Sequence, residues 1–451
     1  KEGDYKPYLI KSTNRGKSWK MITGGLPEKT LVWRITQDHV NKDLMFLGTE
    51  FGLYFTVTGG ENWVELTGGV PTISFRDVRI QRRENDLVAG SFGRGIFILD
   101  DYSPLRSLNA DTLEEEALLF AKAQNLMYLE DELHSDSQGD DQWVAENPPY
   151  GATFTYYLKD SFKTAKDKRV EADKKLAKDG KDVVYPAWDV LEAELREDEP
   201  AVFVTVKDAA GAMVRHVPAA NKKGIQRVTW DFHHALKEAI TNEPRPSWMG
   251  PARGVRALPG TYTATLNVRQ GGVIRELTSP VSFEVVDYIE PTLEKSTPAE
   301  VQAFQEKIVR IDAAIDAASL TIADLQKQLE GYRTALDRTA DRAALEAQFA
   351  AIRAELFSLD EAINGKKADD QKGAEPATIS SRVSFAKGSA GSYYGPTPQS
   401  HEQLGYALDA FAGVRERLIA LTETTIPAFE KAMLDAGAPW VRGADMLPPL
   451  D

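Results

Sequence analysis

Alternating apolar and polar residues mark several short strands in the first two thirds of the chain. Residues 152–158, 202–207 and 262–268 alternate as a strand does when one face is buried and the other is solvated. The middle run stops at the turn residues 208–211. These runs predict an antiparallel β-sandwich over residues 146–289.

Two segments depart from this β pattern. Residues from about 160 to 200 are rich in lysine, acids and alanine, which predicts a solvated helical insertion within the sandwich. Residues 105–145 are expected to be a connector, in which the acidic stretch from Ser135 to Asp141 is typical of a loop. Trp230 ends an apolar run and is expected in the core rather than in a binding site.

After residue 290 the apolar spacing becomes helical. Apolar residues recur at alternating intervals of three and four from Val301 to Leu336, and again from Leu345 to Ile363. The sequence Thr297-Pro298-Ala299-Glu300 offers a cap, a first-turn proline and a capping-box acid, so it predicts where the first helix begins. The two runs predict an antiparallel, coiled-coil-like hairpin.

A third helix is expected from Leu404 to Leu421, with a kink near Pro427. The polar, glycine- and serine-rich residues from Lys366 to Ser400 are predicted to form a loop. Residues 290–451 are therefore predicted to be a helical hairpin extended to a three-helix bundle. The apolar seam either packs within this bundle or serves dimerisation or docking to a membrane protein.

A short pattern occurs twice near the start of the chain, 44 residues apart, at residues 12–19 and 56–63. Each copy leads into a Thr-Gly-Gly-x-Pro loop and is accompanied by strand-like segments that end in glycine-rich turns. A repeat of this length, built from short strands, predicts β-propeller blades over residues 1–104. A propeller needs at least about four blades, so we expect the chain to be the C-terminal part of a larger protein.

The pattern is similar to the Asp-box, or BNR repeat, which reads Ser-x-Asp-x-Gly-x-Thr/Ser-Trp. Such boxes lie on the outer rim of propellers, where the short polar side chain and the glycine stabilise a tight turn and the tryptophan packs between sheets. The resemblance therefore implies a structural role for these residues. The positions that correspond to the box are Ser12, Asn14, Gly16, Trp19, Thr56, Gly60 and Trp63.

A longer resemblance covers residues 1–106. Residues 32–54 and 85–101 resemble the last blades of large bacterial proteins with a sortilin-type, BNR-containing propeller, which are often labelled glycosyl hydrolases. Residues 224–231 and 259–262 resemble immunoglobulin-like or fibronectin-like modules of secreted bacterial enzymes. The resemblance implies a multidomain protein of β plus α class that is secreted, periplasmic or on the bacterial cell surface.

Propellers bind ligands at a central channel that their innermost strands line. We expect the inner strands at residues 32–36 and 75–80, with Arg34 and Arg76 at comparable places in the two blades. Arginines there either bind a ligand carboxylate or form ion pairs with acids such as Asp77. The candidate ligand-binding residues of the channel are Trp33, Arg34, Glu50, Arg76, Asp77 and Arg94.

Composition narrows the choice of chemistry. The net charge of −14 disfavours a nucleic-acid partner, and the lack of cysteine excludes disulfides and thiolate chemistry. The six histidines show no i, i+4 metal pair, and no phosphate-binding glycine loop is present, so neither a metal nor a cofactor is expected. No apolar run approaches the roughly 18 residues of a membrane-spanning helix.

Two functions fit these observations. The first is a secreted or cell-surface propeller protein that binds a peptide or glycan, or takes part in envelope assembly, without catalysis in this part of the chain. The alternative is a sialidase- or xyloglucanase-like glycoside hydrolase whose catalytic residues lie mainly upstream, because only Glu50 and Asp77 qualify here as acids. The expected partners are the upstream propeller portion, in the same or a cleaved chain, and a second copy or an envelope complex.

Overall fold

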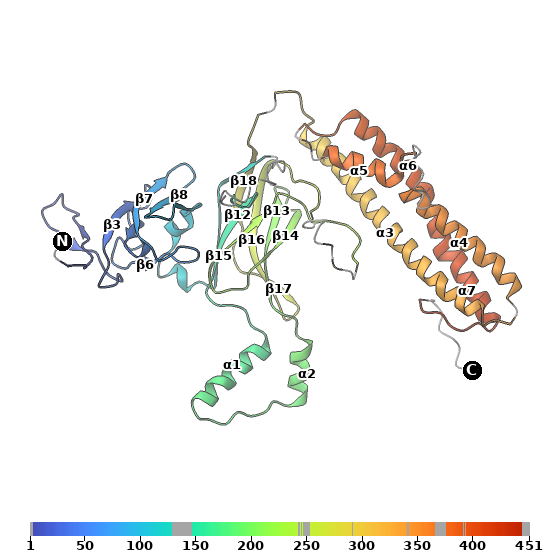
Figure 1. The fold of residues 1–451 in the computed structure, drawn as a ribbon, viewed down its shortest axis with the longest axis horizontal. Helices are drawn as coiled ribbons and strands as arrows, with labels where there is room; N and C mark the ends of the chain where they lie inside the picture. The colour runs from blue at the N-terminus through green and yellow to red at the C-terminus, as the bar shows by residue number, and fades with distance from the viewer. Residues whose placement is uncertain are drawn as a thin grey trace. The chain divides into compact units, whose positions relative to one another are not determined.

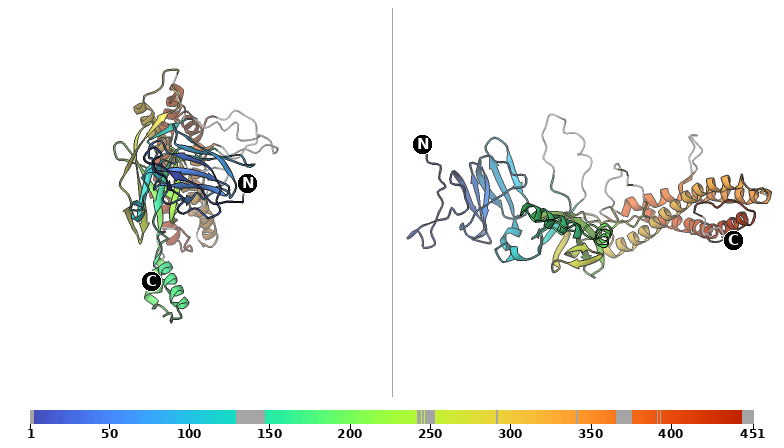
Figure 2. Two further views of the ribbon diagram at one scale, coloured as in Figure 1. Left: turned by 90° about the vertical axis from the view of Figure 1, so that its left-hand side faces the viewer. Right: turned by 90° about the horizontal axis from the view of Figure 1, so that it is seen from below.

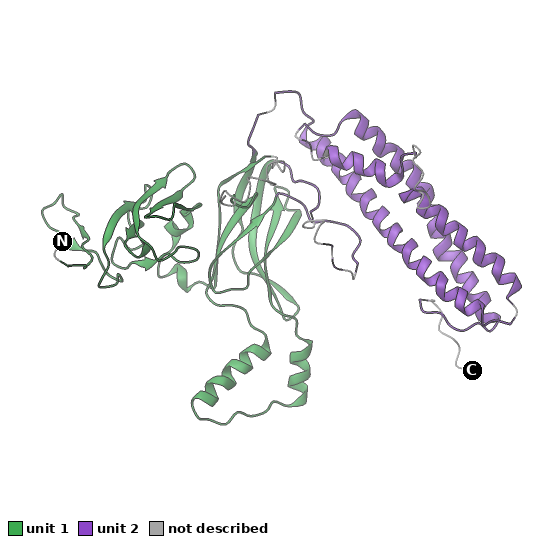
Figure 3. Cartoon of the chain, in the orientation of Figure 1, with its two compact units in different colours: residues 1–231, 259–286 green, residues 232–258, 287–451 purple. Residues whose placement is uncertain are grey.

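The chain consists of several β-sheets followed by long helices, as the computed structural model shows (Figures 1 and 2). Contacts divide it into unit 1, residues 1–231 with 259–286, and unit 2, residues 232–258 with 287–451 (Figure 3). The protein is thus of mixed β plus α class with a helical C-terminal region. The structure describes residues 3–128, 147–241, 244, 246, 253–290, 292–340, 342–365, 376–390, 392 and 394–443. The predicted acidic loop from Ser135 to Asp141 lies outside these residues.

Three small antiparallel sheets occupy the first hundred residues. A hairpin joins β1 (Ile10–Lys11) to β2 (Lys20–Met21). A four-stranded sheet has the order β3 (Val32–Gln37), β4 (Met45–Thr49), β5 (Gly52–Thr56) and β6 (Val64–Glu65). A three-stranded sheet has the order β7 (Phe75–Gln81), β8 (Asp86–Ser91) and β9 (Ile96–Leu99). Within the described part of the chain, no sheet closes into a barrel.

Apolar side chains join these sheets into a stack. Phe46 of β4 belongs to the same buried cluster as Phe75 of β7. Its neighbour Leu47 belongs to a second cluster with Leu9 and Ile22, which flank the β1–β2 hairpin. Successive residues of a strand point to opposite faces, so β4 is covered on both sides and is buried along its whole length.

A buried carboxylate ties the connector to the four-stranded sheet. The Asp38 side chain, in the turn after β3, accepts hydrogen bonds from Tyr102 Oη at 2.5 Å and from Arg106 Nε and Nη2 at 3.0 and 2.9 Å. Arg106 lies in a short 3₁₀ helix, η1 (Ser103–Ser107). Burial opposes ionisation of Asp38, but hydrogen bonds from Arg106, backbone N–H groups and Tyr102 outweigh it and lower its pKa.

Two further antiparallel sheets follow, as the alternating pattern predicts. One has the order β10 (Ala117–Ala121), β12 (Ala152–Leu158) and β15 (Gly224–Trp230). The other has the order β11 (Gln124–Met127), β18 (Val281–Asp287), β16 (Gly260–Gln270), β13 (Ala201–Asp208) and β14 (Met213–Ala219), and β17 (Val273–Glu276) also pairs with β16. A 3₁₀ turn, η2 (Thr112–Glu114), precedes β10.

Aromatic residues from both sheets meet in one core. The ring centroids of Phe154 and Phe283 lie 5.2 Å apart, and those of Trp230 and Tyr262 lie 5.0 Å apart. Each pair joins one sheet to the other, so the sheets pack face to face. Trp230 is fully buried, which confirms that it is a core residue.

The predicted helical insertion is present between β12 and β13. It holds α1 (Ala165–Lys178) and α2 (Trp188–Arg196), and a capping box of Thr164 and Asp167 opens α1. Arg169 Nε and Nη2 donate to the two oxygens of Glu194 at 2.7 Å, linking the helices. None of the α1 side chains is buried, as the solvated composition predicts.

Unit 2 contains five helices within the described residues. Helix α3 starts at the predicted capping box, where Thr297 Oγ1 accepts from Glu300 N and the Glu300 carboxylate accepts from Thr297 N. The buried faces of α3 and α4 contribute to the same apolar cluster, which confirms the predicted hairpin (Figure 2). The helices are α3 (Pro298–Leu336), α4 (Ala343–Asn364), α5 (Ile379–Ala390), α6 (Pro398–Ala420) and α7 (Ile426–Asp435).

The prediction of a loop from Lys366 to Ser400 is wrong over its middle. Residues 379–390 form α5, whose Ile379, Val383 and Ala386 are buried in the helical cluster. Serines, lysine and glycine surround these three apolar residues and hide their helical spacing in the sequence. The irregularity expected near Pro427 is a π-helical turn, Leu421–Thr425, directly before α7.

Candidate functional site

The two larger N-terminal sheets begin with equivalent bulged strands. The register of β3 shifts around Trp33 and that of β7 shifts around Arg76, 43 residues later. A bulge adds one residue to a strand and redirects its side chain. Arg76 is therefore the counterpart of Trp33, and Asp77 is the counterpart of Arg34. The expectation that Arg34 and Arg76 occupy comparable places is wrong by one residue, because the bulged positions are 43 residues apart and these two arginines are 42 apart.

The two bulge side chains stack on each other. The guanidinium carbon of Arg76 lies 3.6 Å from the centroid of the Trp33 ring, within the range of a cation–π contact. Phe92, in the loop after β8, offers a second ring at 5.2 Å from the same carbon. Trp33 and Phe92 are 42% and 71% exposed, so both rings also present surface to solvent.

A carboxylate organises this stack. Glu50, in the turn between β4 and β5, accepts hydrogen bonds at Oε2 from Trp33 Nε1 at 2.7 Å and from Ser74 Oγ at 3.1 Å. Arg76 Nη2 lies 3.6 Å from the same oxygen, and Arg76 Nε donates to Ser74 Oγ at 2.8 Å. We call Trp33, Glu50, Ser74, Arg76 and Phe92 the aromatic–arginine cluster.

The backbone positions the two turns of the cluster in the same way. The N–H group of Glu50 donates to the carbonyl of Leu31 at 2.9 Å, and that of Phe92 donates to the carbonyl of Ser74 at 2.8 Å. The acceptors are 43 residues apart, as the bulges are. Sequence analysis missed Ser74 for two reasons. Its counterpart in the other copy is the apolar Leu31, and no local pattern indicates that a polar residue is required at this position.

A second ion-pair group lies on the same strands. Arg34 Nε and Arg79 Nε approach the two oxygens of Asp77 at 3.2 and 3.1 Å. Hydrogen bonding from Arg79, with the charges of Arg79 and Arg34, holds the pKa of Asp77 below its usual value despite some desolvation. Of the two alternatives for Arg34, the ion pair with Asp77 is the one present. Arg79 was missed although it lies two residues from Asp77, the spacing that shares a strand face.

The last candidate, Arg94, is not part of either group. It lies in the exposed turn between β8 and β9. In residues 3–128 its side chain forms no hydrogen bond or ion pair. The structure thus brings together Trp33, Glu50 and Arg76 in one group and Arg34 and Asp77 in another.

The turn in the first copy of the repeat, residues 12–19, is closed by two hydrogen bonds. The N–H group of Gly16 donates to Ser12 Oγ at 2.7 Å, and that of Ser18 donates to Asn14 Oδ1 at 2.8 Å. Each bond spans four residues. Asn14 therefore serves in the place of the expected aspartate, because its amide oxygen accepts as a carboxylate would.

The diverged second copy makes the same two bonds. The N–H group of Gly60 donates to Thr56 Oγ1 at 3.2 Å, and that of Asn62 donates to Thr58 Oγ1 at 3.0 Å. All four residues stand 44 positions after their counterparts. The Thr58 hydroxyl oxygen accepts the bond that the Asn14 amide oxygen accepts in the first copy. The turn therefore keeps both hydrogen bonds although its sequence has diverged.

The tryptophans of the two copies differ in their surroundings. Trp63 is 3% exposed, and its Nε1 donates to the carbonyl of Ile22 at 2.7 Å. Trp19 is 60% exposed. The difference follows from the stack, because Trp63 packs on the β1–β2 hairpin, whereas no sheet formed by the described residues covers Trp19.

Asp77 does not suit a general acid. Two arginines hold its carboxylate and lower its pKa, whereas a catalytic proton donor needs a raised pKa. Glu50 is held by hydrogen bonds from Trp33 and Ser74 and lies beside Arg76. No group of acids and histidines in the described segments could hold a metal ion. No helix among these segments is long and apolar enough to cross a membrane.

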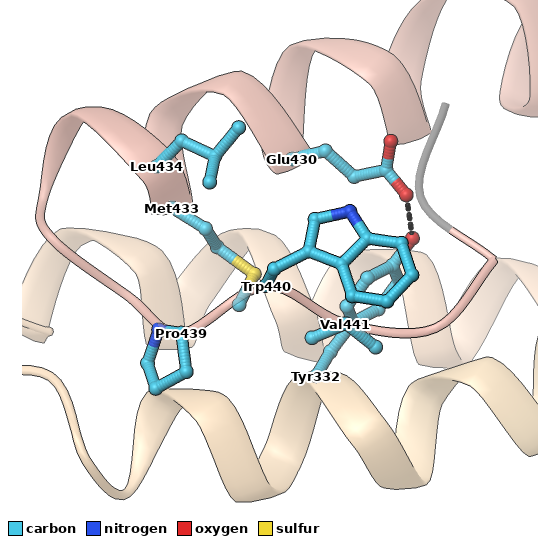
Figure 4. Close-up of a pocket in the computed structure, with 7 residues that line it drawn as sticks. All are labelled: Tyr332, Glu430, Met433, Leu434, Pro439, Trp440 and Val441. Atoms are coloured by element: carbon cyan, nitrogen blue, oxygen red, sulfur yellow. Dashed lines mark hydrogen bonds between the residues drawn. The ribbon is translucent and has the colours of Figure 1, made fainter. Parts of the chain in front are cut away.

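A small pocket in unit 2 lies beside a buried carboxylate. Glu430 of α7 accepts a hydrogen bond from the Tyr332 hydroxyl (Figure 4). It accepts a second one, at 3.1 Å, from Gln328 Nε2. Trp440 and Val441, from the segment after α7, cover it. Its interior has room for about one water molecule, so the pocket stabilises packing and is too small for a ligand.

Comparisons with known proteins give no relative for this chain. No protein-family model and no curated protein matches it. Among solved structures, the extracellular domain of a protein described as a one-component system of B. thetaiotaomicron matches with a TM-score of 0.17 and 12% identity, over 62% of this chain and 28% of that one. A structure described as part of a hybrid two-component system of that organism gives 0.16 and 12%, with the same coverage. The chain spans less than a third of the length of these structures, and likenesses with scores this low carry no argument about its fold or function.

Proposed function

We propose that the three N-terminal sheets are successive blades of an Asp-box β-propeller of sortilin type, and that the protein binds a carboxylate-bearing peptide or glycan beside β3 and β7. The observation that carries this proposal is the recurrence of the turn hydrogen bonds 44 residues apart and of the strand bulge 43 residues apart. A repeat of this kind builds stacked, equivalent sheets. The bulges then bring the side chains of Trp33 and Arg76 together at the starts of β3 and β7.

The charges and the exposed aromatic rings around Trp33 and Arg76 favour an anionic ligand. Arg34, Arg76 and Arg79 face only two carboxylates, so the site has a local positive excess in a chain with a net charge of −14. A guanidinium group presents parallel N–H donors that match a carboxylate. The exposed rings of Trp33 and Phe92 offer flat apolar surfaces for a sugar ring or an apolar side chain.

The exposed Trp19 supports a further blade next to the β1–β2 hairpin. Its counterpart Trp63 is buried on the neighbouring sheet and bonds to a backbone carbonyl there. By the same repeat, Trp19 packs on another sheet in the assembled propeller. The protein is, in this proposal, secreted or on the bacterial surface, where peptide and glycan ligands occur, and this part of the chain acts in binding rather than catalysis.

Calorimetric titration tests the binding site. The probes are N-acetylneuraminic acid, a hexapeptide with a free C-terminal carboxylate and the same peptide with an amide end. We expect binding of at least one carboxylate probe, and at least tenfold weaker binding by the double variant Arg34→Gln/Arg79→Gln. The control variant Arg82→Gln/Arg83→Gln loses the same charge from exposed positions outside the site and should bind normally.

Two results count against the proposal. If the control variant weakened binding equally, the loss would be explained by the change in overall charge. If the amidated peptide bound as tightly as the peptide with a free carboxylate, recognition of the carboxylate would be excluded. Mass spectrometry of a sialylated oligosaccharide that has been incubated with the protein covers the alternative function. Cleavage that is lost in Glu50→Gln would favour a glycoside hydrolase instead.

A further inference from the structure

An open groove lies in unit 1 at the base of the helical insertion. It has a volume of about 670 Å³. Its lining comes from the residues just before β10 and β15, the end of β16, β17, the segment that leads into α1, and the first turn of α1. Ligand-binding clefts in proteins commonly span about 300–1,000 Å³. The groove lies on different elements from the aromatic–arginine cluster, so it is a separate candidate site.

The charge of the groove is opposite to that of the chain. Five cationic side chains line it, against the three carboxylates of Glu114, Glu116 and Asp160. The protein as a whole has a net charge of −14. A positive cleft in an acidic protein concentrates anions locally. The cations are Lys159, Lys163, Lys168, Lys223 and Arg275.

Two of the ion pairs in the groove can be exchanged easily. Lys159 Nζ lies 2.8 Å from Glu114 Oε2, and Lys223 Nζ lies 2.8 Å from Asp160 Oδ1. The side chains of Glu114 and Asp160 are 77% and 72% exposed. Exposed pairs contribute little because water and salt compete for both charges. An anionic ligand can therefore take the place of these carboxylates at small cost.

Other groups in the groove are free or suited to hold a sugar. Lys168, on the first turn of α1, is exposed and forms no ion pair within the described residues. Phe162 contributes an aromatic ring that lies 5.9 Å from the guanidinium carbon of Arg275. Arg275 itself is held by both oxygens of Glu116, at 2.6 and 2.8 Å, which fixes its position beside the ring.

We infer that this groove binds an acidic oligosaccharide, a chain of sugar rings that carries carboxylate or sulfate groups. Lys159, Lys223 and Arg275 each have a separate carboxylate partner, so the positive charges are distributed around the groove instead of converging on one point. A ligand with several spaced charges matches this distribution better than one small anion. The ring of Phe162 provides the apolar surface on which a sugar face stacks.

Binding of defined anions to the full chain tests this inference. The probes are a heparin-derived hexasaccharide, a galacturonate hexamer and inorganic phosphate, titrated by calorimetry at constant ionic strength. We expect at least one hexasaccharide to bind, and Lys168→Glu/Lys223→Glu to weaken it at least tenfold. The control Lys175→Glu/Lys178→Glu makes the same charge change at exposed α1 positions outside the groove and should alter affinity less than threefold.

Removing the competing acids gives a second, opposite readout. Glu114→Gln/Asp160→Asn should bind the hexasaccharide at least threefold more tightly, because the lysines are then released for the ligand. The matched control Asp189→Asn/Glu192→Gln changes two exposed acids of α2 and should have no comparable effect. Far-ultraviolet circular dichroism verifies the fold of each variant.

Three outcomes would overturn the inference. The first is that neither hexasaccharide binds the unmodified protein. The second is that phosphate binds as tightly as the sugars, which would make the groove a small-anion site. The third is that each control shifts the affinity as much as its groove variant does, which would reduce the effect to general electrostatics.

Discussion

Replacement of Trp63 by alanine tests the equivalence of the two repeated turns, residues 12–19 and 56–63, because the chain contains its own control in Trp19. Trp63 is 3% exposed and donates to the carbonyl of Ile22, whereas Trp19 occupies the same place in its turn and is 60% exposed. Truncation of a buried tryptophan costs about 3–5 kcal/mol, in which the unpaired Ile22 carbonyl accounts for about 1 kcal/mol. Trp19→Ala should change the free energy of unfolding by at most about 0.5 kcal/mol.

Hydrogen exchange followed by mass spectrometry is the suitable assay, since a chain of two units need not unfold in one step. In peptides that cover β4 and β5, a loss of about 3–5 kcal/mol corresponds to exchange that is faster by about two to three and a half powers of ten. Trp63→Phe keeps a ring but lacks the N–H donor, and it should fall between alanine and the wild type.

The result that would refute the reasoning is an equal cost for both alanine variants. A cost below about 1 kcal/mol for Trp63→Ala would also contradict it, because the buried contact with the β1–β2 hairpin would then contribute almost nothing. Circular dichroism before exchange separates a local loss of protection from complete unfolding.

Three further predictions concern other parts of the chain. Arg106→Met should destabilise unit 1 by about 3–5 kcal/mol, because it leaves the buried Asp38 carboxylate without its ion-pair partner. Since the pKa of Asp38 is lowered in the folded state, the stability that this carboxylate contributes is present above about pH 3.9 and declines as pH falls further. Urea unfolding of the wild type at pH 7 and pH 3 should show this decline. Gly413→Ala, in α6, should stabilise unit 2 by about 0.4–1 kcal/mol, because a Cβ there meets no atom within 4 Å; a lower melting temperature would contradict this. Gly151→Ala should cost more than about 2 kcal/mol, because φ is +135° and the new Cβ would lie 2.0 Å from the Trp230 carbonyl oxygen; thermal unfolding that matches the wild type would exclude the predicted clash.

Much of the fold follows from local periodicity and can be predicted without coordinates. Alternation over residues 152–158 and 262–268 predicts strands, and the structure has β12 and β16 there. The capping sequence at Thr297 predicts the first residue of α3. Short apolar runs interrupted by serine and glycine give too little periodic signal, so α5 was missed.

The candidate site was predictable only in part. The sequence pointed to Trp33, Glu50 and Arg76 through the repeat, but it could not show that Trp33 and Arg76 stack or that Ser74 bridges Arg76 and Glu50. A bulge shifts a strand by one residue, and whether a repeat contains one depends on pairing with the next strand. The equivalence of Arg34 and Arg76 was wrong because strand pairing places the two bulges 43 residues apart, one more than the spacing of these arginines.

The sequence by itself determined the kind and order of most elements, with α5 as the exception, as well as the 44-residue repeat and the capped start of the helical region, because these depend on neighbours a few positions away. Only the tertiary structure decided which side chains meet. Glu114, Lys159, Lys223 and Arg275 come from four distant segments and line the same groove. Asp38 pairs with Arg106, which lies 68 residues later in the sequence. Contacts of this length depend on how the sheets pair and stack, and no local pattern encodes that choice.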